Sequence, residues 1–139
     1  MTQLKNDFQI TLQSSNGILL VRIVGFLTAE KYKTCWTQVV ELMERQPILK
    51  MLIDMSESQV VAPENQQWLQ THYFPRLLKL PYFERLRVAR VVSKGIFGQV
   101  SLANIEKGWQ ERTLLTTKNK AEDFNSLEDA ERWLASQEN

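Results

Sequence analysis

Cysteine and histidine are nearly absent from this chain of 139 residues, which contains one of each. A single cysteine excludes a disulfide framework, and a structural zinc site needs about four cysteine or histidine ligands. We therefore expect no metal and no cofactor. We interpret Cys35 as a small buried hydrophobic residue, and its free thiol is typical of a reducing compartment.

An excess of charge of one sign is lacking as well. The 17 Lys and Arg residues nearly balance the 16 Asp and Glu residues, which gives a formal net charge of +1. Nucleic-acid binding usually needs a basic surplus, so this balance argues against that class. No apolar run approaches the roughly 18 residues of a membrane span, and the N-terminal residues lack the apolar core of a secretory signal. We expect a cytoplasmic protein with no nucleic-acid and no integral membrane contact.

What is present is a globular composition, with 43% hydrophobic and 24% charged residues. A chain of this length forms one domain, here residues 1–139. Apolar alternation and short apolar runs predict strands at residues 8–12, 18–24, 48–55, 85–93 and 113–117. Helices are predicted after Thr28, Pro63, Gly98 and Ser126, and residues 118–125 are predicted to be a surface loop.

Local signals mark the ends of several elements. Asn16-Gly17 predicts the turn of a hairpin, and Thr28 is a suitable N-cap. Ser126 with Asp129 forms a capping box, and Pro75 should kink or restart the second helix. The predicted apolar helix faces are Tyr32, Cys35, Trp36, Val39, Val40 and Met43, then Trp68, Leu69, His72 and Tyr73, and finally Ala130, Trp133 and Leu134.

The resulting order is ββαβαβαβα, which predicts an α/β fold. We expect a mixed, mostly parallel sheet with an N-terminal β-hairpin and helices on both faces. The strand at 48–55 should be central, with the strand at 85–93 beside it. Ligands of open α/β sheets bind beyond the carboxyl ends of strands, so Met55-Ser56 and Ser93-Lys94 should form one shared rim.

Three segments carry a resemblance to a known family: LIDMS at 52–56, VSKGIFGQ at 92–99 and FNSLEDAERWL at 124–134. The chain resembles the STAS-type fold of the anti-sigma factor antagonists of sporulating bacteria. It is more closely similar to small uncharacterised bacterial STAS-like proteins, which are loosely related to the lipid-binding SEC14 domain. The resemblance implies a non-enzymatic regulatory or interaction module that binds a protein partner or self-associates, with a dimer as one form.

In the antagonists of that family, the loop after the central strand holds a phosphorylatable serine. Here the strand ends in Asp54-Met55-Ser56, but the next helix opens with VAPEN at 61–65, which has no hydroxyl. Ser56 and Ser58 lie several residues earlier. Glu64 places a negative charge in the first helical turn, either as an ordinary partner of the helix dipole or as a mimic of phosphoserine, and we favour the former.

Two other patterns contain residue types that are found in catalytic or anion-binding sites. His72 with Asp54 and Ser56 supplies the side chains of a hydrolase triad, but no Gly-x-Ser-x-Gly elbow occurs and a packing role for His72 is favoured. Lys94 and the glycines after it offer an anion site at a helix start, although the spacing matches no nucleotide-binding loop. Close packing of that helix on the sheet explains the same glycines.

Residues 68–83 are rich in aromatic side chains and are interrupted by two prolines. Such a segment lines an apolar pocket, forms a partner surface or simply covers the sheet. The first possibility makes the protein a carrier of a small apolar or lipid-like ligand. No catalytic residue is assigned. The candidate ligand- or partner-binding residues are Asp54, Ser56, Ser58, Glu64, Trp68, Ser93, Lys94 and Phe97.

Overall fold

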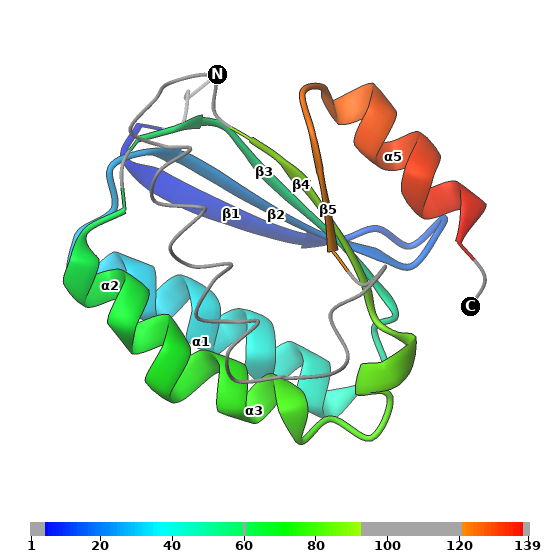
Figure 1. Ribbon diagram of the computed structural model, residues 1–139, viewed down its shortest axis with the longest axis horizontal. Coiled ribbons are helices and arrows are strands. Elements are labelled where there is room, and N and C mark those ends of the chain that lie inside the picture. Colours follow the sequence, from blue (N-terminus) through cyan, green and yellow to red (C-terminus); the bar gives the residue numbers. More distant parts are fainter. Residues whose placement is uncertain (1–4, 60, 93–120, 138–139) are drawn as a thin grey trace.

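The computed structural model describes residues 5–59, 61–92 and 121–137, and it has a sheet with helices on both sides (Figure 1). The chain begins with the predicted hairpin, formed by β1 (Asp7–Leu12) and β2 (Ile18–Gly25). Gly17 has a φ of 70°, and its N–H donates to the Gln13 carbonyl at 2.9 Å. Of the Asn-Gly pair, only Gly17 adopts the left-handed conformation, because the connection is longer than a two-residue turn.

The described sheet has five strands in the order β1-β2-β3-β4-β5. β3 (Lys50–Ser58) pairs in parallel with β2 on one side and with β4 (Arg87–Val91) on the other. β5 (Ala121–Phe124) continues the parallel part beside β4. The central position of β3 and the mixed, mostly parallel sheet confirm the predicted fold class. Asp54 pairs with Val91, so β3 and β4 end at the same edge, as expected.

Several predicted boundaries are wrong. β3 begins at Lys50 rather than at Ile48, and β4 ends at Val91. β3 runs on to Ser58, because Glu57 and Ser58 still pair with Val24 and Gly25 after a register shift in β2. Arg85 belongs to a short 3₁₀ turn (Phe83–Arg85), and β4 begins only at Arg87. Part of the predicted loop at 118–125 is β5, whose acidic sequence suits an exposed edge strand. The predicted helix after Gly98 and the predicted strand at 113–117 lie outside the described residues.

One face of the sheet is covered by α1 (Ala29–Arg45) and by a second helical segment. That segment consists of α2 (Pro63–Trp68), a π-helical turn (Leu69–Tyr73) and α3 (Phe74–Leu78). The helix therefore restarts at Pro75, as predicted. All six residues predicted for the apolar face of α1 are buried. His72 is exposed, which corrects its predicted place on the apolar face, because the wider π turn changes the helical phase.

The opposite face is covered by α5 (Leu127–Ser136), which lies above the sheet in Figure 1. The Ser126 hydroxyl accepts from the Asp129 N–H at 3.2 Å, and the Thr28 hydroxyl accepts from the Lys31 N–H at 3.3 Å. Both predicted N-caps are therefore confirmed. In the described ranges, no helix has the length and apolarity to cross a lipid bilayer.

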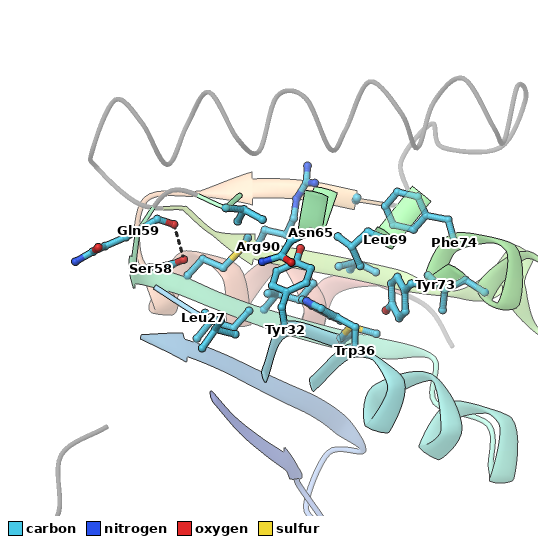
Figure 2. Close-up of a pocket in the computed structure, with 18 of the residues that line it drawn as sticks. Leu27, Tyr32, Trp36, Ser58, Gln59, Asn65, Leu69, Tyr73, Phe74 and Arg90 are labelled. Carbon is cyan, nitrogen blue, oxygen red and sulfur yellow. Dashed lines mark hydrogen bonds between the residues drawn. The ribbon is translucent and has the colours of Figure 1, made fainter. Parts of the chain in front are cut away.

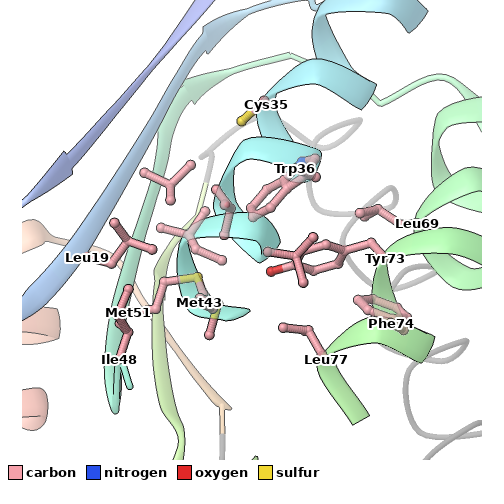
Figure 3. Packing of buried hydrophobic residues seen from close by; sticks show 14 of the residues in the cluster. Leu19, Cys35, Trp36, Met43, Ile48, Met51, Leu69, Tyr73, Phe74 and Leu77 are labelled. Atoms are coloured by element: carbon pink, nitrogen blue, oxygen red, sulfur yellow. The ribbon is translucent and has the colours of Figure 1, made fainter. Parts of the chain in front are cut away.

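The protein has two hydrophobic clusters, one on each face of the sheet. The larger cluster fills the space between the sheet and the layer of α1, α2 and α3 (Figure 3). The smaller one joins Leu52, Ala89 and Val91 to Ala130 and Leu134 of α5. Helices on both faces were predicted, and this division confirms them. Most of the aromatic side chains that the structure describes belong to the larger cluster or pack against it.

Candidate functional site

An apolar pocket of about 100 Å³ lies inside the larger cluster, between the sheet and the helical layer (Figure 2). Its lining comes from β2, β3, β4 and β5, and from α1, α2, the π turn and α3. Most of these side chains are aliphatic or aromatic. The lining includes Ile23, Tyr32, Trp36, Met51, Ile53, Met55, Ser58, Asn65, Leu69, Tyr73, Phe74, Leu77, Val88 and Arg90.

The spacing of these residues along their strands and helices places them on the faces that line the pocket. Met51, Ile53 and Met55 alternate along β3, so all three face the same side of the sheet. Tyr32 and Trp36 are one helical turn apart on α1. Across from them, the second helical segment contributes Asn65, Leu69, Tyr73 and Leu77, spaced at intervals of four residues.

Aromatic rings form the wall on the helical side. The Trp36 and Tyr73 rings lie 5.1 Å apart at 56°, and Tyr32 meets Trp36 edge-on at 6.4 Å. Tyr73 also contacts Phe74 at 5.7 Å. These tilted arrangements are the favoured ones for aromatic pairs. Because Trp36 comes from α1 and Tyr73 from the π turn, the contact fastens the two helical segments to each other (Figure 3).

Two buried polar atoms in the pocket lining make no hydrogen bond: Nε1 of Trp36 and Oδ1 of Asn65. Trp36 is 5% exposed and Asn65 is 1% exposed. The indole N–H lies near the Tyr32 hydroxyl, where it opposes the rise of that group's pKa, but the pair does not reach hydrogen-bond geometry. Buried polar atoms without partners are uncommon, because each loses its hydration with nothing in return.

Burial keeps the tyrosine hydroxyls of the pocket and the nearby Cys35 thiol in their neutral forms. Burial, with the nearby Cys35 thiol, raises the pKa of Tyr32 and of Tyr73 far above the ordinary tyrosine value. Burial also raises the pKa of the Cys35 thiol to about 12. Arg90 is the one charged residue in the described lining, and its Nε donates to Asp123 Oδ1 at 2.6 Å. The site therefore suits a neutral, apolar molecule.

The residues predicted at the end of β3 form a separate, polar cluster. Asp54 Oδ1 accepts from the Ser56 N–H at 3.1 Å and from the Ser56 hydroxyl at 2.7 Å. Oδ2 of Asp54 lies 4.0 Å from Arg22, which also pairs with Glu57. Asp54 and Ser56 are thus brought together, but by local strand geometry and on an exposed edge. Of Ser56 and Ser58, the two predicted serines that the structure describes, only Ser58 reaches the pocket. Its hydroxyl donates to the Gln59 carbonyl at 3.1 Å.

Glu64 and Trp68, the other predicted residues that the structure describes, do not join that cluster. Glu64 is exposed in the first turn of α2. Trp68 is half-buried and stacks on the exposed His72, with ring centroids 5.5 Å apart. Nδ1 of His72 lies 2.8 Å from the Thr71 hydroxyl. Ser93, Lys94 and Phe97 lie outside the described residues.

Tyr32, Trp36 and Asn65 are pocket residues that were not predicted as a site. Tyr32 and Trp36 were assigned only to the apolar face of a helix, which is correct but incomplete. One signal was available for Asn65, which stands four residues before Leu69 in the phase of the buried face. A carboxamide at a core-facing position needs a partner, so its presence there is itself a sign of a polar contact.

Comparison with known proteins gives a likeness at the level of the fold. No protein-family model and no curated protein matches the chain. Among solved structures, it is similar to an uncharacterised protein of the DUF3478 family with a SpoIIAA-like fold, from Shewanella loihica PV-4. The two are 20% identical over 96% of this chain and 98% of that chain, with a TM-score of 0.49. The fold named for that protein is of the STAS type that the sequence of this chain resembles, and the likeness extends to no function.

Proposed function

We propose that this chain is a non-enzymatic binding module that carries a small apolar ligand between its sheet and its helical layer. The observation that supports this function is the pocket among Trp36, Tyr73 and Ile53. Native cores are packed to nearly crystalline density and contain few voids larger than a water molecule. A partly open pocket of about 100 Å³, lined mainly by residues of the larger hydrophobic cluster, is therefore a candidate binding site.

The size and the lining define the class of ligand. A dry apolar cavity of about 150 Å³ is known to hold benzene, so this pocket suits a small ring or a short alkyl chain. Burial of such a group stabilises the complex by roughly 25 cal/mol per Å² of apolar surface. The aromatic wall of Trp36, Tyr73 and Phe74 adds ring contacts.

The arrangement of the candidate catalytic side chains supports a non-enzymatic role. Oδ1 of Asp54 accepts two hydrogen bonds from Ser56. The His72 ring instead contacts Trp68 and Thr71. A triad needs histidine between the nucleophile and the carboxylate, with a hydrogen bond to each. His72 has neither contact in the structure, so the three residues do not form one.

Toluene tests the carrier function directly, because it is apolar and close to the pocket in size. We expect saturable binding to the wild-type chain, with a rise in melting temperature as toluene increases. Val88→Phe fills the pocket from β4 and should abolish that rise. Leu20→Phe is the matched control, since Leu20 packs against the cluster on the opposite face. Equal toluene responses in the two variants, or none in the wild type, would contradict the proposal.

A second function, self-association, is favoured by the edge of the sheet at β1. Among the described strands, β1 pairs only with β2, so its outer edge is unpaired. Its sequence contains neither lysine nor proline, which commonly protect edges from pairing. Leu12 and Phe26, which are 37% and 40% exposed, lie near the two ends of this edge. A second copy of the chain could add its own β1 there.

Light scattering after size exclusion tests this second function. The wild type should elute as a dimer whose fraction rises with concentration. Replacing the exposed Gln9 and Thr11 of β1 by lysine should give a monomer, because two rows of like charge would face each other. Ser14→Lys in the hairpin turn is the control and should leave the dimer intact. A monomeric wild type at every concentration would rule out this interface.

A further inference from the structure

We infer that the pocket selects a ligand with a neutral polar head that both accepts and donates a hydrogen bond, such as a hydroxyl. This inference rests on the proposed carrier function and specifies its ligand. It is carried by the two polar atoms without partners, the Trp36 Nε1–H donor and the Asn65 Oδ1 acceptor. Figure 2 shows Trp36 and Asn65 reaching into the pocket from different helices, α1 and α2.

The pair is informative because its members are complementary but do not bond to each other. A hydroxyl is the smallest group that serves both, since its oxygen accepts from the indole and its proton goes to the amide oxygen. An apolar ligand would leave both atoms desolvated and unpaired. Sites built to bond a hydroxyl discriminate strongly against analogues that lack one, for this reason.

An anionic head fits less well. A carboxylate needs several hydrogen-bond donors, and Trp36 Nε1–H would supply only one. Its negative charge would also be repelled by the lone pairs of Asn65 Oδ1. The cation in the described lining, Arg90, is already paired with Asp123 at 2.6 Å. Transfer of a charged group into a pocket of this kind is unfavourable unless it is fully paired. The ligand class is therefore a small aromatic or aliphatic alcohol rather than a fatty-acid anion.

Phenol, toluene and benzoate form a matched set of probes at pH 7, with one ring and three different substituents. The readout is the ratio of the dissociation constant of toluene to that of phenol. Trp36→Phe removes the donor, and Asn65→Leu removes the acceptor with little change of shape. Each should reduce this ratio about tenfold, the usual worth of one hydrogen bond. Trp133→Phe, on the opposite face, should leave the ratio unchanged.

A second measurement on the wild-type chain does not depend on either variant folding. The chain has four tryptophans, so its amide NMR spectrum contains four indole N–H signals. Phenol should shift the Trp36 indole proton downfield as a hydrogen-bond acceptor arrives, and toluene should not. The Trp133 signal provides the internal reference for probe effects outside the pocket.

The outcomes separate the two proposals. If neither phenol nor toluene binds the wild type, the carrier function and this inference both fail. If both bind but the ratio does not change in Trp36→Phe and Asn65→Leu, the carrier function stands and the polar-head inference is wrong. Benzoate binding more tightly than phenol would also overturn the inference, because it would show that the pocket selects an anion.

Discussion

At the scale of single residues, Gly25 at the end of β2 is a position where no side chain can be accommodated. It has a φ of 73°, and a Cβ built there would overlap the Asn6 carboxamide. That carboxamide accepts from the Phe26 N–H at 2.9 Å and so fixes the end of β2. The close approach and the left-handed conformation both require glycine.

Gly25→Ala should therefore destabilise the protein more than Gly17→Ala does. Gly17 also has a positive φ of 70°, but a Cβ there meets nothing within 4 Å. The Gly17 variant should lose about 1–2 kcal/mol, the cost of the left-handed backbone alone. Gly25→Ala adds displacement of Asn6 and should lose at least about 1 kcal/mol more. Urea unfolding of both variants measures the difference. Equal losses of unfolding free energy would show that the Asn6 side chain moves aside at no cost.

Cys35 gives a pH-dependent prediction at the same scale. Burial, with a smaller contribution from Asp7, raises the pKa of its thiol from 9.0 to about 12. The unfolded chain therefore releases this proton first as pH rises. The stabilisation is complete below about pH 9 and is lost as pH approaches about 12. Between about pH 8 and pH 10 the wild type should lose about 1.4 kcal/mol from this group.

The Cys35→Ala variant isolates that contribution. Its free energy of unfolding should fall by about 1.4 kcal/mol less than that of the wild type over the same interval. Tyr32 and Tyr73 titrate in both proteins, so their effect largely cancels from the comparison. Chemical unfolding at several pH values gives both slopes. Parallel slopes would mean that the thiol has the same pKa in the folded and the unfolded protein.

At the scale of elements, contacts near the end of α1 hold the segments of the helical layer to one another. The Tyr82 hydroxyl donates to the Met43 carbonyl at 2.6 Å in the last turn of α1. Arg76 of α3 donates to Glu44 of α1 at 3.0 Å, and this contact lowers the Glu44 pKa. The exposed ion pair contributes little, whereas the tyrosine satisfies a carbonyl that the helix end would leave unpaired.

The Ser126 N-cap allows a test of how much one helix end contributes to stability. Ser126→Ala removes the acceptor of the Asp129 N–H at the start of α5. We expect a loss of about 1 kcal/mol, the usual cost of removing such a cap. Ser15→Ala, in the exposed hairpin turn, is the control and should stay within about 0.5 kcal/mol of the wild type. Thermal unfolding measures both, and an unchanged Ser126→Ala variant would show that α5 is held by packing alone.

Sequence reasoning worked best for elements with strong local patterns. The hairpin, the central strand and the face of α1 follow from alternation, from an Asn-Gly pair and from helical spacing. β5 was missed because Glu122 and Asp123 face solvent at an edge, so no apolar pattern marks it. The exposure of His72 was missed because a π turn changes the phase of a helix without any sequence signature.

At the scale of the whole molecule, the pocket arises from contacts that no local pattern encodes. Trp36 and Tyr73 are each predictable as buried, but their contact depends on how α1 crosses the second helical segment. The same holds for Asn65, whose neighbours come from other parts of the chain. The prediction of a site at the shared rim of β3 and β4 remains a prediction. The pocket gives a more specific hypothesis, because its volume and unpaired atoms can be tested separately.

A crystal structure of the wild-type chain soaked with toluene tests directly whether the pocket holds a small apolar ligand. We expect toluene density in contact with Trp36, Tyr73 and Ile53, between the sheet and the helical layer. The same soak of the Val88→Phe variant should show the phenylalanine ring in that place and no toluene. Density only on the outer surface, or a wild-type core in which those three side chains close on one another, would contradict the account.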